Sequence, residues 1–65
     1  MLSPQTRAIE TLCLEAEQAA RDGDFTTARD KQAELASGEG IAPLMAEAVG
    51  RFIDRCREQQ QEHAA

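Results

Sequence analysis

Apolar residues recur every three or four positions through most of the chain, which is the spacing of one face of an α-helix. The first such segment opens with Ser3 and Pro4, a residue pair typical of a helix start. It predicts a helix over residues 4–22. Its apolar side comprises Leu2, Ile9, Leu12, Cys13, Ala16 and Ala20. Leu14 falls among polar neighbours on the other side, where it is either an ordinary exposed leucine or an extension of a contact surface.

Two further segments show the same period. Residues 25–36 have a narrow inner side that is interrupted by a glutamine: Phe25, Ala28, Gln32, Leu35 and Ala36. Residues 43–61 have the broadest apolar stripe of the chain, which comprises Ile41, Met45, Ala48, Val49, Phe52 and Cys56, with Leu44 and Ile53 on its edges. No alternating strand pattern competes with these helices. We therefore expect an all-α fold, a helical hairpin plus a longer third helix that together resemble a three-helix bundle. It would form a single small domain over residues 1–65, with 62–65 as a frayed tail.

Gly50 lies inside the third predicted helix, with Ala46 one turn before it. A glycine in a helix interior costs about 1 kcal/mol relative to alanine. A tolerated surface glycine is the preferred interpretation. The alternative is that this pair of small residues lets another helix approach closely.

The stretch RDGDFTTARD, residues 21–30, could be either an acidic cation loop or a corner between helices. A calcium loop that began at Asp22 would need a glycine at its sixth position and a glutamate at its twelfth. Those positions hold Thr27 and Ala33. A corner needs only Gly23 as a left-handed helix end and Asp24 as the cap of the next helix. We therefore predict a corner.

This corner and its flanking helices resemble one helix–turn–helix unit of the tetratricopeptide type. The residues that carry the resemblance lie within 9–36: Leu12, Ala16, Ala20, Gly23, Asp24, Phe25 and Ala28. Glu15 and Gln32 depart from the pattern, since apolar residues are usual at their positions, and one unit is fewer than a repeat array needs. In outline, the chain is also similar to the small acidic helical chaperones of flagellar and type III secretion systems. Neither resemblance supplies a functional residue beyond these packing positions.

The composition limits the size of the hydrophobic core that such a fold can form. Large aliphatic and aromatic side chains make up only about 17% of the residues, below the roughly 20% under which a chain of high net charge tends toward disorder. Twelve alanines raise the apolar fraction, but they add more helix propensity than burial. We therefore expect a thin core that is completed by another protein or by a second copy of the chain, as a homo-oligomer or a hetero-complex.

The net charge of −5 disfavours nucleic acid and anionic membranes, both of which need clustered basic residues. No apolar run approaches the ~20 residues of a membrane-spanning helix, and the N-terminus lacks the pattern of a secretory signal. Two cysteines without a C-x-x-C spacing suit a reducing compartment. These features predict a cytoplasmic protein.

Candidate chemistry is sparse. Cys13 and Cys56 both lie on apolar stripes, where a free thiol behaves as a small hydrophobe, although a disulfide between the first and third helices is the alternative. His63 has no second ligand at metal-binding spacing. The glycine-rich residues 37–40 lack the lysine of a phosphate loop. We predict no catalytic site, no metal and no cofactor, and hence no enzyme.

The pattern favours a protein–protein interaction module, a chaperone, an adaptor or a homodimeric accessory factor, that binds through the apolar face of the third helix. The predicted partner-binding residues are Leu44, Met45, Val49, Phe52 and Ile53 as anchors, with Arg51 and Arg55 on the rim. The alternative is a small helix-turn-helix regulator formed by the second and third helices, with Arg51, Arg55 and Arg57 facing phosphate. The balance of charges on the second helix disfavours it, because Asp30 and Glu34 offset Arg29 and Lys31.

Overall fold

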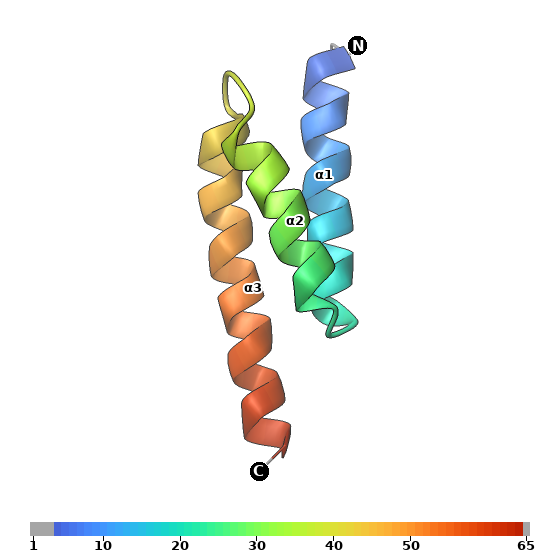
Figure 1. Ribbon diagram of the computed structural model, residues 1–65, viewed down its shortest axis with the longest axis vertical. Coiled ribbons are helices and arrows are strands. Elements are labelled where there is room, and N and C mark those ends of the chain that lie inside the picture. Colours follow the sequence, from blue (N-terminus) through green and yellow to red (C-terminus); the bar gives the residue numbers. More distant parts are fainter. Residues whose placement is uncertain (1–3, 65) are drawn as a thin grey trace.

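The computed structural model describes residues 4–64, with side chains as far as residue 61, and this part of the chain forms three α-helices (Figure 1). Helix α1 spans Pro4–Arg21, α2 spans Phe25–Ala36 and α3 spans Ala42–Ala64. The all-α, three-helix prediction is confirmed. The predicted bounds of α2 are matched, whereas α3 begins at Ala42 and continues past the predicted end at Gln61. Leu2 and the predicted cap Ser3 lie outside the described residues.

The helices form a rod with extents of 44 × 17 × 16 Å. Helices α1 and α2 make an antiparallel hairpin, and α3 lies alongside both, so each helix contacts the other two (Figure 1). Because two reversals separate them, α1 and α3 run in the same direction. The C-terminal turns of α3 project beyond the corner between α1 and α2 (Figure 1).

The corner between α1 and α2 is closed by backbone hydrogen bonds. The N–H of Gly23 donates to the carbonyl of Ala20, and the N–H of Asp24 donates to the carbonyl of Ala19, at 3.1 and 2.8 Å. This is a Schellman motif, in which the residue after the helix end adopts a left-handed conformation. Gly23 has φ +83°, a conformation that costs a residue without a Cβ little. The predicted corner is confirmed.

Asp24 also caps α2. Its carboxylate accepts hydrogen bonds from the backbone N–H and the hydroxyl of Thr27, at 3.2 and 2.6 Å. These bonds lower the pKa of Asp24, the hydroxyl bond having the larger effect and the backbone bond the smaller. The second aspartate, Asp22, accepts from the side-chain amide of Gln18 at 3.2 Å. Both carboxylates are therefore used in local hydrogen bonds of the corner.

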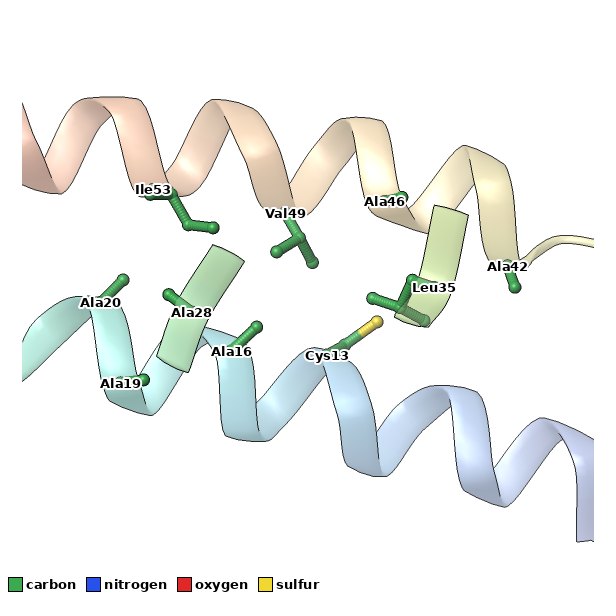
Figure 2. Packing of buried hydrophobic residues seen from close by; sticks show 10 residues of the cluster. All are labelled: Cys13, Ala16, Ala19, Ala20, Ala28, Leu35, Ala42, Ala46, Val49 and Ile53. Atoms are coloured by element: carbon green, nitrogen blue, oxygen red, sulfur yellow. The ribbon is translucent and has the colours of Figure 1, made fainter. Parts of the chain in front are cut away.

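The core consists mostly of alanines. Within the described residues, the buried apolar side chains come from all three helices and point toward one another (Figure 2): Cys13, Ala16, Ala19, Ala20, Ala28, Leu35, Ala42, Ala46, Val49 and Ile53. Among the side chains that are less than 2% exposed, the two largest are Leu35 and Ile53. Small residues on facing helices allow close approach of the backbones, which compensates in part for the scarcity of large side chains.

A polar network joins α2 to α3 at Gly50. The side-chain amide of Gln32 donates to the backbone carbonyl of Ala46 at 3.2 Å. Arg29 donates to the Gln32 side-chain oxygen at 2.8 Å and forms an ion pair with Asp54 at 2.6 Å. Gly50 is buried beneath Gln32. The surface interpretation of this glycine is therefore wrong, because α2 approaches α3 closely at this point.

A second polar contact joins α1 to α2. Lys31 forms an ion pair with Glu15 at 3.6 Å. Glu15 and Gln32 are the two residues at which the chain departs from the tetratricopeptide pattern, and both are polar. Glu15 contacts α2 through its ion pair with Lys31, and Gln32 contacts α3 through its hydrogen bond to Ala46. Polar contacts therefore replace apolar packing at both positions.

Candidate functional site

An apolar groove lies between α1 and α3, on the side of the molecule to which α2 contributes no residue. It has a volume of about 180 Å³ and is lined by Thr6, Ile9, Glu10, Cys13, Leu14, Ile41 and Met45. We refer to it as the α1–α3 groove. Its walls are formed almost entirely by aliphatic and sulfur-containing side chains, which can bind an apolar group but offer little polar chemistry.

Large apolar side chains are exposed around this groove. Leu14 and Ile41, which line it, are 58% and 53% exposed, and Leu44, one helical turn after Ile41, is 65% exposed. Single exposed apolar residues are common on protein surfaces. Three that gather around one apolar groove form a patch, and such patches mark interaction surfaces.

Helix α3 divides the predicted anchors between two sides. Met45 lines the α1–α3 groove and Leu44 is exposed beside it. Val49 and Ile53 are only 3% and 0% exposed, and they pack inside the chain between α1 and α2 (Figure 2). Those two side chains already serve the core and are not available to a partner in this structure. The stripe predicted from the sequence therefore contains both a buried side and an exposed side.

Phe52 connects the groove side of α3 to α1. Its ring is half-buried against the core, and the guanidinium of Arg21 lies 5.5 Å from the ring centroid. This distance is within the range of a cation–π contact, which is worth about 0.5–1 kcal/mol at an exposed site. Phe52 thus contacts α1 at its last residue, Arg21.

The two arginines predicted on the rim, Arg51 and Arg55, are exposed on α3. They share the exposed side of α3 with Leu44 and Ala48. The facing edge of α1 carries Glu10, Glu17 and, one turn further, Arg21, whose guanidinium lies over the Phe52 ring of α3. The α1 edge is therefore of mixed charge, and the two predicted rim arginines lie on α3.

Cys13 lies at the floor of the α1–α3 groove. Burial raises the pKa of its thiol, and the nearby carboxylates of Glu17 and Glu10 raise it further. A raised pKa keeps the thiol protonated and unreactive at neutral pH. Cys56 is partly exposed, and both cysteines are free thiols. The groove is therefore suited to binding and is poorly suited to nucleophilic catalysis.

Two other hollows of similar size are more polar. One, of about 210 Å³, lies between the ends of α1 and α3 and includes Arg21, Gln59 and Gln60 in its lining. The other, of about 170 Å³, lies between α1 and the turn before α3 and includes Gln5, Glu34 and Glu39. No group of three potential metal ligands occurs within residues 4–61. The side chain of His63 lies outside the described residues.

Comparison of the chain with protein-family models, with curated proteins and with solved structures gave no match. Among the helices in the described part of the chain, none is long and apolar enough to cross a membrane. The site must therefore be interpreted from its own geometry.

Proposed function

We propose that this chain is a small protein-interaction module, a chaperone, adaptor or accessory factor, that binds a helical segment of its partner along the α1–α3 groove. The observation that carries this proposal is the gathering of Leu14, Ile41 and Leu44, each more than half exposed, around a groove that the chain itself does not fill. An amphipathic helix with apolar residues at i, i+3 or i+4 and i+7 fits such a groove.

The energetic reason is the transfer of these side chains out of water. Complete burial of a leucine or isoleucine contributes about 1.5–3 kcal/mol. Leu14, Ile41 and Leu44 retain more than half of that possible gain. Since the internal core is made mostly of alanines, these exposed side chains are a large share of the bulky apolar surface in the chain. We place the protein in the cytoplasm, where its two free thiols would remain reduced.

Regulation of transcription by duplex binding through α2 and α3 receives less support. Both cations of α2 have carboxylate partners, because Arg29 pairs with Asp54 and Lys31 pairs with Glu15. A duplex-binding helix needs cations that are free to contact phosphate. These ion pairs leave the exposed arginines of α3 as the remaining phosphate contacts, which weighs against the helix-turn-helix alternative.

Site-specific photo-crosslinking tests the proposed function. A photoreactive amino acid is introduced at position 44, beside the groove, and separately at position 33, an exposed alanine on α2. Irradiation in cells, followed by mass spectrometry, should yield one reproducible polypeptide adduct from position 44 and none from position 33. The adduct should disappear when Leu14→Glu is added. Equal adducts from both positions, or none from position 44, would contradict the proposal.

A further inference from the structure

The surface around the α1–α3 groove carries both signs of charge. Glu10 and Glu17 lie on α1, where Arg21 follows on the same edge, and Arg51 and Arg55 lie on α3. A uniformly basic helix in the groove would be repelled by the arginines, and a uniformly acidic helix would be repelled by the glutamates. A second copy of this chain has both signs on the same surface, which is the self-complementarity that a two-fold interface requires.

The direction of the helices allows such a pairing. Helices α1 and α3 run in parallel (Figure 1), so a two-fold axis along them places α1 of each copy against α3 of the other without reversing either. Glu17 lies one turn before Arg21, and Arg21 contacts Phe52, the neighbour of Arg51. Glu17 and Arg51 are therefore at similar heights along the rod, and the rotation brings the glutamate of one copy toward the arginine of the other.

The exposed area of the chain is also larger than that of a compact monomer. Its accessible surface is 4655 Å², whereas a compact monomer of 7.1 kDa exposes roughly 4,100 Å². The difference, roughly 550 Å², follows from the elongated shape of the rod, 44 × 17 × 16 Å. Association of two rods side by side reduces the exposed surface per chain.

We propose that the α1–α3 groove is covered by the same groove of a second copy, with Glu17 of each chain against Arg51 of the other. This inference rests on the proposed function, since it names the partner of the same surface. Leu14, Ile41 and Leu44 of both copies form the apolar centre of the interface. The two Glu17–Arg51 pairs fix its parallel arrangement.

Sedimentation equilibrium of the full chain in the presence of reductant tests the association. Loading concentrations from about 1 µM to about 1 mM cover the range expected of a moderate interface. The mass should rise with concentration from 7.1 kDa to twice that value. Leu14→Glu should raise the dissociation constant about a hundredfold, because a two-fold interface contains the substitution twice. Ala33→Glu adds the same charge on α2 and should leave the constant unchanged.

Leu44→Glu is a second variant with the same expected effect. Leu14 and Leu44 are both largely exposed, and circular dichroism should show that both variants remain folded. A wild-type chain that stays at 7.1 kDa throughout the range would overturn the inference. So would an Ala33→Glu chain that dissociates as readily as Leu14→Glu.

Charge reversal tests the arrangement. Glu17→Arg and Arg51→Glu should each weaken association about tenfold, and the double variant should recover most of the loss. A double variant that is weaker than either single variant would overturn the parallel arrangement. A monomeric chain that still crosslinks to a different polypeptide from position 44 would refute the second copy and leave the proposed function standing. A monomeric chain with no crosslink would refute both.

Discussion

The side-chain amide of Gln32 occupies the space that a side chain at position 50 would need. A Cβ placed on Gly50 would come within 2.5 Å of the Gln32 nitrogen, which is closer than carbon atoms of this kind are found. The amide uses that space to reach the backbone carbonyl of Ala46, the residue one turn before Gly50. The glycine is therefore required for a hydrogen bond between two other residues.

This relationship predicts that the effect of Gly50→Ala depends on the residue at position 32. In the wild-type chain, the substitution should change the free energy of unfolding by less than about 0.5 kcal/mol, because the loss of the hydrogen bond from Gln32 to Ala46 offsets the gain in helix propensity. In a Gln32→Ala background, it should raise the free energy of unfolding by about 0.5–1 kcal/mol. Urea denaturation of the four chains measures this coupling. Ala48→Gly, at an exposed site on the same helix, calibrates the propensity alone, and an equal effect in both backgrounds would contradict the relationship.

The cap of α2 should make stability depend on pH. The hydrogen bonds from Thr27 lower the pKa of Asp24 in the folded chain, so the ionised carboxylate is favoured more in the folded than in the unfolded state. The stabilisation is present above the unfolded carboxyl pKa of about 3.9 and is lost as the pH falls through the lower folded value. Melting temperatures between about pH 7 and pH 2.5 should show the wild type above Asp24→Asn at neutral pH, with the two converging in acid. Asp30→Asn removes a charge from the same helix and should show no such convergence.

The division of α3 into a buried and an exposed side predicts opposite outcomes for similar truncations. Ile53 is fully buried, so Ile53→Val should lower the free energy of unfolding by about 1 kcal/mol and Ile53→Ala by about 2–4 kcal/mol. Leu44→Ala should change it by less than about 0.5 kcal/mol at low micromolar concentration, where association does not contribute. Denaturation of the three variants measures these values. Comparable losses at both positions would show that the assignment of the two sides is wrong.

The two thiols should differ in reactivity. Cys13 is 7% exposed and burial raises its pKa, whereas Cys56 is partly exposed. A chromogenic disulfide reagent at neutral pH should therefore label Cys56 first and Cys13 at least about tenfold more slowly, since Cys13 must wait for local opening. Cys13→Ser and Cys56→Ser assign the two phases. In denaturant, the rates should become similar, and equal rates in the folded chain would contradict the burial of Cys13.

The sequence was sufficient to predict the helices because their ends are chemically marked. Gly23 and Asp24 define one corner, and the glycines of residues 37–40 together with Pro43 define the other. Periodicity also placed Leu44 and Met45 on the apolar stripe of α3. It could not show which edge of that stripe the chain would cover itself. Val49, Ile53 and Leu44 have similar hydrophobicity, and the choice depends on where α1 and α2 pack.

That packing is determined by residues with little hydrophobic signal. Ala42 and Ala46 face the core because their small size allows other helices to approach, and the same property makes alanine weak in any hydrophobic pattern. Gln32 and Gly50 have no apolar signal at all, and their contact is visible only when both helices are in place. The sequence pattern likewise did not predict the α1–α3 groove. It did single out Leu14, which lines the groove, as a leucine on a polar side of its helix.

The alanine core also determines how the chain responds to heat. The heat capacity change of unfolding follows the apolar area that becomes hydrated, and an average chain of 65 residues would show roughly 0.8–1.0 kcal/mol/K. A core with so few bulky members hydrates less apolar area when it opens, so its stability curve is flatter than average. Its melting enthalpy is correspondingly small, and the transition extends over a wide span of temperature. The protein should therefore lose its structure gradually on heating.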